Sequence, residues 1–179
     1  MIKQKWFRYY PALPERQLGH RIIMSWDTAA KNGAQNDWSV CTVWLLADKV
    51  YYLLDMVRGR YEYPELRDTA IALAERYKPF AILIEDASTG TALAQELKLA
   101  GLYPVRLIPV HHDKIGRLYV QQGKFERGQV QFPKDQPFMA EVEKELLSFP
   151  QGKTDDIVDS ISQALAFDDW GYDSTLSWV

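Results

Sequence analysis

Three aspartates lie close together near the end of the chain. The segment KTDDIVDSI, residues 153–161, contains Asp155, Asp156 and Asp159 at the start of a predicted helix. Asp156 and Asp159 are three positions apart and share one helix face, and Asp155 and Asp159 share an adjacent one. Like charges this close repel, so something must compensate for the repulsion.

Two explanations compete for this cluster. Acidic residues in a first helical turn complement the helix dipole by about 0.3–1 kcal/mol each, and Thr154 suits the N-cap. Taken alone, the segment favours this explanation. The alternative is a divalent cation, because clusters of carboxylate oxygens are the ligands that Mg²⁺ and Mn²⁺ prefer.

Further carboxylates end two predicted strands. Asp27 ends the apolar run 21–27, and Glu85 and Asp86 end the run 79–86. Ligand sites in open α/β sheets form outside the carboxyl ends of the strands, so Asp27 and Glu85 converge if their strands are parallel neighbours. Asp86 follows Glu85 directly and points to the other face. Each acid alone also fits an ordinary first loop residue, but together with the late cluster they predict a metal site. Two ions about 3.5–4 Å apart activate water and stabilise the leaving oxygen in phosphodiester cleavage.

The elements that position these acids follow from hydrophobic periodicity. A tight hairpin joins the second and third strands, and later strands alternate with helices, which predicts an α/β fold. The sheet is expected to be mixed, with an antiparallel hairpin on one side, parallel strands on the other and helices on both faces. The predicted strands are 21–27, 38–47, 49–59, 79–86, 103–110 and 129–133; the predicted helices are 63–77, 88–101, the first half of 113–128, 137–150 and 154–167.

Composition limits the other possibilities. The chain of 179 residues is 47% hydrophobic, which fits one folded domain of 21–170, with 1–20 as an arm or connector outside the core and 171–179 as a tail. No apolar run reaches the ~20 residues that a membrane span needs, and the N-terminus lacks the apolar core of a signal peptide. The single Cys41 argues for a reducing setting, so we expect a cytoplasmic protein without membrane contact.

Positive charge is concentrated in one stretch although the net charge is -3. Two acids, Asp113 and Glu126, oppose it there. Such a stretch can contact phosphate, although each residue alone also fits a solvated surface. The stretch contains Arg106, His111, His112, Lys114, Arg117, Lys124 and Arg127.

Other catalytic motifs are absent from the sequence. There is no G-x-x-x-x-G-K-[ST] motif, which excludes a P-loop ATPase of that kind within this chain. No C-x-x-C pair is present for zinc, and no G-x-S-x-G nucleophile elbow appears.

The three acidic motifs resemble those of a known family. SWDTA after one strand, LIEDASTG after another and DDIVDS opening a late helix are similar to motifs of the nuclease domain of phage terminase large subunits. The resemblance extends from WFRYYPALP to ALAF. It implies an RNase H-like fold related to the RuvC resolvases and cleavage of concatemeric viral DNA during genome packaging. It also implies two divalent ions, Mg²⁺ or Mn²⁺, as cofactors.

The resemblance assigns roles to residues of this chain. Asp27 matches the aspartate that bridges the metals, Glu85 matches the acid ending the fourth strand, and Asp156 and Asp159 match the helix acids. These four residues are the predicted catalytic residues and metal ligands, and Asp155 is a metal ligand that could replace either helix acid.

Two more features carry over with the family. Asp37 in NDWSV is a possible peripheral ligand. HDKIGRLY resembles the basic segment that holds the DNA backbone, so His112, Lys114 and Arg117 are the predicted DNA-binding residues.

The resemblance also implies partners. These are double-stranded DNA, an ATPase motor domain, the terminase small subunit and the portal. The motor is missing from this sequence, so we expect a C-terminal fragment, a remnant or a split gene, acting in the host cytoplasm. Three rivals remain: a RuvC-like resolvase or repair nuclease, a non-catalytic remnant that docks DNA or protein, and a phosphoacceptor domain. The initial hairpin disfavours the last.

Overall fold

The computed structural model describes residues 1–30, 37–101 and 104–167. They form a 7-stranded sheet with strand order β1-β7-β4-β3-β2-β5-β6. The strands are β1 (Tyr9–Tyr10), β2 (Arg21–Asp27), β3 (Ser39–Ala47), β4 (Val50–Gly59), β5 (Ala81–Glu85), β6 (Val105–Ile108) and β7 (Val130–Pro133). The helices are α1 (Tyr63–Tyr77), α2 (Thr89–Leu99), α3 (Lys114–Glu126), α4 (Met139–Ser148) and α5 (Asp156–Ala166), preceded by a short 3₁₀ turn at Gln4–Trp6.

The sheet is mixed, as the sequence predicts. β2, β3 and β4 are antiparallel neighbours, whereas β5 and β6 continue the sheet parallel to β2, and β7 and β1 continue it in parallel beyond β4. Asp48 and Lys49 join β3 to β4, and both have positive φ. This is the conformation of the two-residue turns whose twist matches that of a hairpin.

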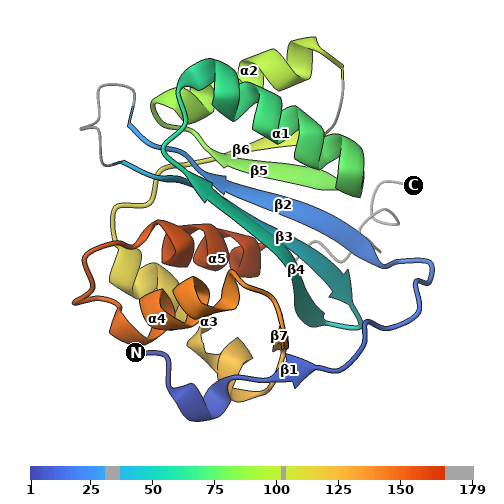
Figure 1. Cartoon of the computed structure of the whole chain (residues 1–179), viewed down its shortest axis with the longest axis vertical. Coiled ribbons are helices and arrows are strands. Elements are labelled where there is room, and N and C mark those ends of the chain that lie inside the picture. Colours follow the sequence, from blue (N-terminus) through green and yellow to red (C-terminus); the bar gives the residue numbers. More distant parts are fainter. Residues whose placement is uncertain (31–36, 102–103, 168–179) are drawn as a thin grey trace.

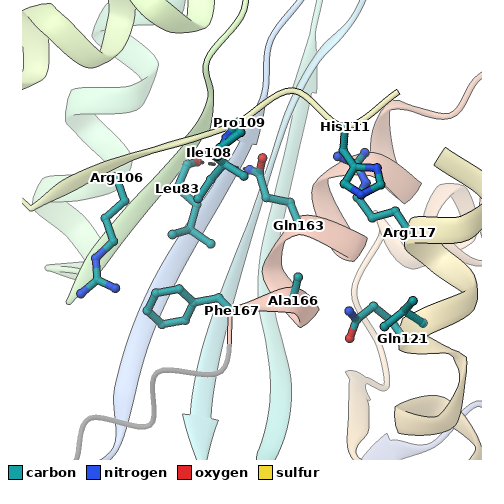
Figure 2. A pocket seen from close by; sticks show the side chains of 11 residues that line it. Leu83, Arg106, Ile108, Pro109, His111, Arg117, Gln121, Gln163, Ala166 and Phe167 are labelled. Atoms are coloured by element: carbon teal, nitrogen blue, oxygen red, sulfur yellow. Dashed lines mark hydrogen bonds between the residues drawn. The ribbon is translucent and has the colours of Figure 1, made fainter. Parts of the chain in front are cut away.

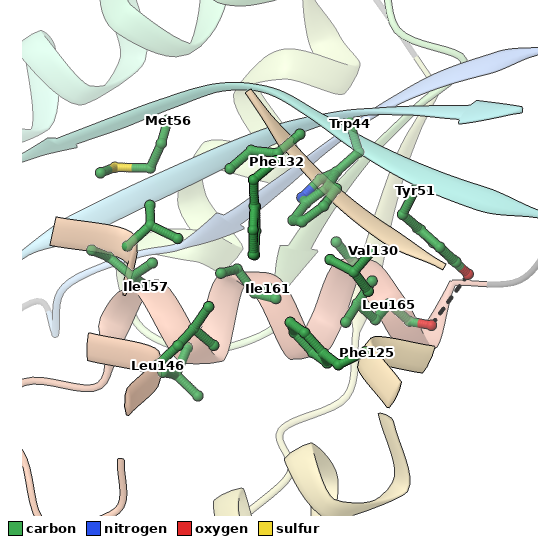
Figure 3. Packing of buried hydrophobic residues seen from close by; sticks show 14 of the residues in the cluster. Trp44, Tyr51, Met56, Phe125, Val130, Phe132, Leu146, Ile157, Ile161 and Leu165 are labelled. Carbon is green, nitrogen blue, oxygen red and sulfur yellow. Dashed lines mark hydrogen bonds between the residues drawn. The ribbon is translucent and has the colours of Figure 1, made fainter. Parts of the chain in front are cut away.

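Helices cover both faces of the sheet (Figure 1). α1 and α2 pack on one face, against apolar residues such as Trp26 and Ile82. α3, α4 and α5 lie on the other face, where α5 packs directly across β2 and β3. Every α5 residue from Ile157 to Leu165 is buried. Figure 3 shows this second core, in which the Tyr51 hydroxyl donates to the Leu165 carbonyl over 3.2 Å.

Two predictions about the elements are wrong. The segment 1–10 contributes to the core rather than forming a free arm, because Ile2, Trp6 and Phe7 are buried and β1 pairs with β7. Burial of large aromatic side chains outweighs the basic charges between them, which stay at the surface. The ring of Phe7 meets that of Phe132 with centroids 5.5 Å apart.

The second error concerns α3, which continues to Glu126 instead of ending halfway. Leu118, Gln121 and Phe125 are spaced for one helix face and are buried against the core, which stabilises the helix despite its two glycines. The predicted strand 103–110 is shortened to β6. Part of 21–170 and the whole tail 171–179 lie outside the described residues, so these domain boundaries stay predictions. No helix among the described residues is long and apolar enough to cross a bilayer.

A buried polar network attaches α5 to the sheet. The Ser160 hydroxyl donates to the Ser25 carbonyl over 2.7 Å and accepts from the Thr42 amide over 3.2 Å. Its only proton is used at Ser25, so the Thr42 hydroxyl, 2.7 Å away, is the donor of their contact. Gln163 adds bonds to the Ser25 hydroxyl and the Trp26 carbonyl. These bonds fix α5 in rotation and height above β2.

Ser160→Ala is expected to destabilise the fold by about 1–3 kcal/mol, because it leaves the buried amide of Thr42 without its acceptor. The measurement is the free energy of urea unfolding. Ser162→Ala is the matched control, because Ser162 is buried in the same helix but, among the described residues, its hydroxyl contacts just the Asp159 carbonyl one turn back. Its expected change is within about 0.5 kcal/mol. Equal losses in both variants would contradict a special role of Ser160.

Candidate active site

Asp27 and Glu85 lie on the same face of the sheet, because side chains alternate between the two faces along each strand. In β2, Ile23 packs in the core under α5, so Asp27, four residues later, points to the same face. In β5, Ala81 and Leu83 face that core, so Glu85 does too. β2 and β5 are parallel neighbours with Trp26 opposite Ile84, so both acids emerge at one edge of the sheet.

One cavity of about 310 Å³ collects most of the predicted site residues. Asp155 does not line it but contacts Lys114, which does. Asp86 does not line it either and instead accepts a hydrogen bond from Thr91, on the other side of the strand end. The lining residues are Asp27, Thr28, Ala29, Ala30, Asp37, Trp38, Glu85, Val110, His111, His112, Lys114, Asp156 and Asp159.

Glu145 of α4, rather than an acid of the aspartate cluster, caps α5. Its carboxylate accepts from the Val158 amide over 2.8 Å and from the Thr154 hydroxyl over 2.7 Å. The N-cap residue is Asp155, whose side chain makes no capping bond, so the expectation of a Thr154 cap is wrong. Thr154 is a donor here because its hydroxyl meets a carboxylate. The cluster is therefore not explained by capping hydrogen bonds.

Two cations hold the carboxylates in ion pairs. Lys114 Nζ lies 2.6 Å from Asp159 and 2.9 Å from Asp155. The Arg117 guanidinium lies 2.7 Å from Asp159 and 3.5 Å from Glu85. The Arg117 side chain is only 10% exposed, so it is placed to hold these acids rather than to reach outward. His112 is exposed at the edge of the cavity.

The protein compensates poorly for negative charge on Asp27 and Asp156. Burial raises the pKa of Asp27 well above its ordinary value, and repulsion from Asp159, Asp156 and Glu85 raises it further. Burial, followed by repulsion from Asp155 and Glu145, raises the pKa of Asp156 to about 6. Charged carboxylates here attract any cation that enters the cavity.

Asp159, unlike Asp27 and Asp156, has its negative charge balanced by a nearby cation, Lys114. Burial raises the pKa of Asp159, although its bonds to Lys114 and the charge of Arg117 act in the opposite direction. Partial burial lowers the pKa of Lys114, but the bonds to Asp159 and Asp155 outweigh it and leave the pKa raised. Lys114 is therefore a charged ammonium throughout the physiological range.

The donor types fit a hard divalent cation. All the carboxylates that converge here offer oxygen, the donor that Mg²⁺ and Mn²⁺ prefer. Among the described residues, no three His, Cys, Asp or Glu side chains are already grouped as around a bound ion. The ion pairs of Asp159 with Lys114 and Arg117 occupy oxygens that a metal would use, so metal binding requires these pairs to rearrange.

A second cavity of about 440 Å³ lies beside the first and shares His111 with it. Figure 2 shows His111 and Arg117 toward one side, Arg106 and Phe167 toward the other, and Gln163 between them. Its walls are largely apolar and no Asp or Glu among the described residues lines it, so it does not offer the chemistry of the first cavity.

Sequence reasoning assigned Arg117 to DNA and did not anticipate two other contributors. Glu145 sits in the middle of a predicted helix, where nothing in the pattern marks it as a cap for another helix. Trp38 reads as the first residue of a buried strand, yet it lines the cavity. Only its position eleven residues after Asp27, at the start of the neighbouring antiparallel strand, signals that it lies near the acid.

Asp27→Asn is expected to raise metal-free stability at pH 7.5 and to have less effect near pH 5. A raised carboxyl pKa adds stability at low pH that is lost as pH rises through the folded-state pKa. For Asp156 this window runs from about 4 to about 6, and for Asp27 it also begins near 4 and extends upward, because its pKa is raised well above the ordinary value. The parent should therefore lose stability more steeply, by at most ~1.4 kcal/mol per pH unit for each proton. Melting curves in EDTA at several pH values measure this, and parallel pH profiles would contradict it.

Lys114→Gln should have the opposite effect on the metal-free protein. Loss of the ammonium removes a partner from Asp159 and Asp155, and the expected cost is about 1 kcal/mol because Lys114 is partly exposed. Added Mn²⁺ should then raise the melting temperature more than in the parent, since a competing cation is gone. Lys98→Gln, exposed on α2, is the matched control. An unchanged Mn²⁺ shift would show that Lys114 does not compete with the ion.

Comparisons with known proteins identify the family and the fold of the chain. A profile of the family described as "Terminase RNaseH-like domain" matches residues 24–167. No curated protein sequence matches the chain.

Solved structures of phage terminases share the fold. The zinc-bound large terminase nuclease of thermophilic phage G20c is 21% identical with a TM-score of 0.68, over 90% of this chain and 94% of that one. The nuclease domain of Thermus phage P74-26 is 23% identical with a TM-score of 0.65, over 93% and 92%.

A large terminase from another thermophilic bacteriophage is 11% identical with a TM-score of 0.65, and the match covers 92% of this chain but 43% of that one. The fold is the RNase H-like fold of terminase nucleases, as predicted. With the profile match over most of its length, the chain belongs to the terminase RNase H-like domain family.

Proposed function

We propose that this chain is a metal-dependent DNA endonuclease that cuts concatemeric phage DNA during genome packaging. The observation that carries the proposal is the convergence of Asp27, Glu85, Asp156 and Asp159, from three separate elements, in one cavity. The family match supports the same conclusion, because the described site lies within the matched residues.

Four carboxylates would hold two Mg²⁺ or Mn²⁺ ions, with Asp155 and Asp37 at the periphery. When bound, such ions activate a water and stabilise the leaving oxygen of a phosphodiester. Structures of the G20c nuclease are described with bound zinc, cobalt and magnesium, which supports divalent ions in this fold.

The chain's own residues prepare the site. The network around Ser160 holds the helix acids above Asp27 and Glu85, so the carboxylates do not move apart under their repulsion. Arg117 aligns Glu85 and Asp159. The exposed Lys114 and His112 at the cavity are the proposed contacts to the DNA backbone, and Arg117 is better placed as a support.

The proposed partners follow from the same family. The large terminase matched over 44% of its chain was solved with ADP, and a further structure of it with ATP-γ-S. We propose that this domain works beside such a motor domain on double-stranded DNA, with the small subunit and portal, in the host cytoplasm.

Plasmid nicking tests the proposal. The domain should nick or cut supercoiled plasmid in Mn²⁺ and Mg²⁺ but not in EDTA, and Ca²⁺ should support little turnover because its larger coordination shell places the oxygens less well. Asp27→Asn should abolish cleavage, because an uncharged amide is a poor bridge between two cations. Asp86→Asn is the matched control and should cut like the parent, since Asp86 faces away from the cavity.

Three outcomes would count against the proposal. Robust cleavage in EDTA would exclude a metal-dependent mechanism. Full cleavage by Asp27→Asn would exclude this cavity as the active site. A parent that binds Mn²⁺ without cutting linear or supercoiled DNA would favour a non-catalytic remnant, and cleavage confined to four-way junctions would favour a resolvase.

A further inference from the structure

A cluster of two arginines and a tryptophan lies at the cavity, on the side formed by the β3–β4 hairpin. Trp38 lines the cavity. The Arg58 guanidinium carbon lies 4.2 Å from the centre of the Trp38 ring, and that of Arg60 lies 4.1 Å from it. We call these three residues the Trp38 cluster. Contacts this short are cation–π interactions, in which the ring holds each guanidinium in place.

Strand register explains why the cluster forms on the side of the acids. Ser39 pairs with Gly59 and Val40 with Arg58, which puts Arg60 across from Trp38 just beyond the last pair. Val40 packs in the core under α5, so Trp38 points to that face, and both arginines share it by alternation. Asp27 pairs with Val40 on the other side of β3 and faces the same way.

The backbone at this strand end is held in position from the opposite face. A side chain at Gly59 would meet the Tyr61 ring at 2.5 Å, so the ring packs directly against the glycine backbone. Tyr61 belongs to the core under α1 and α2. The direction of Arg60 is thus fixed by Trp38 on one face and by Tyr61 on the other.

The cluster leaves one positive charge available. Arg58 is 17% exposed and pairs with Glu141 of α4 at 3.3 Å. Arg60 is exposed, and within the described part of the chain no carboxylate lies at ion-pair distance from it. A fixed, exposed guanidinium beside an acidic cavity would repel a cation and attract an anion.

We propose that Arg60, oriented by Trp38, binds a DNA backbone phosphate on the side of the cavity opposite α3. The inference rests on the proposed function, because it assumes a duplex lying across the carboxylates. When one phosphate of a DNA strand lies over those acids, the phosphates before and after it lie on the two sides of the cavity. Positive side chains on both sides would therefore stabilise the bound strand. Lys114 and His112 supply it from the α3 side, and Arg60 supplies it from the hairpin side.

A phosphate fits the cluster better than an unpaired base. Guanidiniums already lie against the Trp38 ring, so the ring is not free for base stacking. A guanidinium offers paired N–H donors that match phosphate oxygens.

Binding of a fluorescein-labelled duplex in Ca²⁺, measured by anisotropy at several salt concentrations, tests the inference. Arg60→Gln should lower the slope of log affinity against log salt by about 0.9, so that its loss of affinity between 50 and 200 mM salt is about threefold smaller than the parent's. Arg60→Lys keeps the charge and should keep most of the slope. Arg76→Gln is the matched control, because Arg76 also lies over an aromatic ring, that of Tyr77, but on α1 away from the cavity.

The outcomes separate this inference from the nuclease proposal. An Arg60→Gln slope equal to the parent's, or a parent that binds no duplex at low salt, overturns the phosphate site whatever the plasmid assay shows. A lower melting temperature with an unchanged slope also overturns it and makes the cluster a structural brace. A reduced slope in Arg60→Gln alone, with no cleavage by the parent, keeps the phosphate site and removes the nuclease proposal. The Mn²⁺-induced melting shift should be the same in Arg60→Gln and the parent.

Discussion

Negative charge buried at the edge of a rigid sheet is the constraint on which this structure depends. Asp27 and Glu85 emerge from neighbouring parallel strands, and α5 brings two more carboxylates above them. The carboxylates of Asp27 and Asp156 do not favour this arrangement, since burial and mutual repulsion raise their pKa. The ion pairs of Lys114 and Arg117 compensate chiefly for Asp159, Asp155 and Glu85. Burial of the apolar residues of β2, β5 and α5 supplies the free energy that offsets this cost. It fixes the backbone positions of the acids independently of their charge.

The bonds between α5 and the sheet make this arrangement specific as well as stable. An apolar helix face alone can rotate or slide on a sheet at modest cost, because hydrophobic contacts are not directional. Ser160 and Gln163 are bonded to defined atoms of Ser25, Trp26 and Thr42, so a rotated helix would leave buried polar groups without partners. In this way a polar network in the core sets the position of charges in the cavity one turn away.

The sequence predicts the parts of this site that depend on local pattern. Period-2 alternation and an acid at the strand end were enough to place Asp27 and Glu85, and a three-residue spacing placed Asp156 with Asp159. The mixed sheet also followed from one tight hairpin and later alternation of strands and helices. Interactions between distant segments were not accessible, because no local pattern encodes them. Glu145 accepts a hydrogen bond from the amide of Val158, thirteen residues later, and Arg117 turns inward to Asp159 although the nearby His112 and Lys114 are exposed.

The error at the N-terminus has the same origin. Basic and aromatic residues with prolines resemble a solvated arm when read alone, and the burial of Ile2, Trp6 and Phe7 depends on apolar residues that β7, α3 and α4 supply much later in the chain. The surroundings of a basic residue, like those of an aromatic one, decide its role, as Arg117 and the Trp38 cluster show. A buried cation inside the cavity, such as Arg117, is held by the acids, whereas an exposed cation at the cavity, such as Lys114 or Arg60 on its aromatic ring, can still reach an anion. Position relative to the carboxylates, rather than the sign of the side chain, therefore decides which basic residues of this domain support the site and which ones can contact DNA.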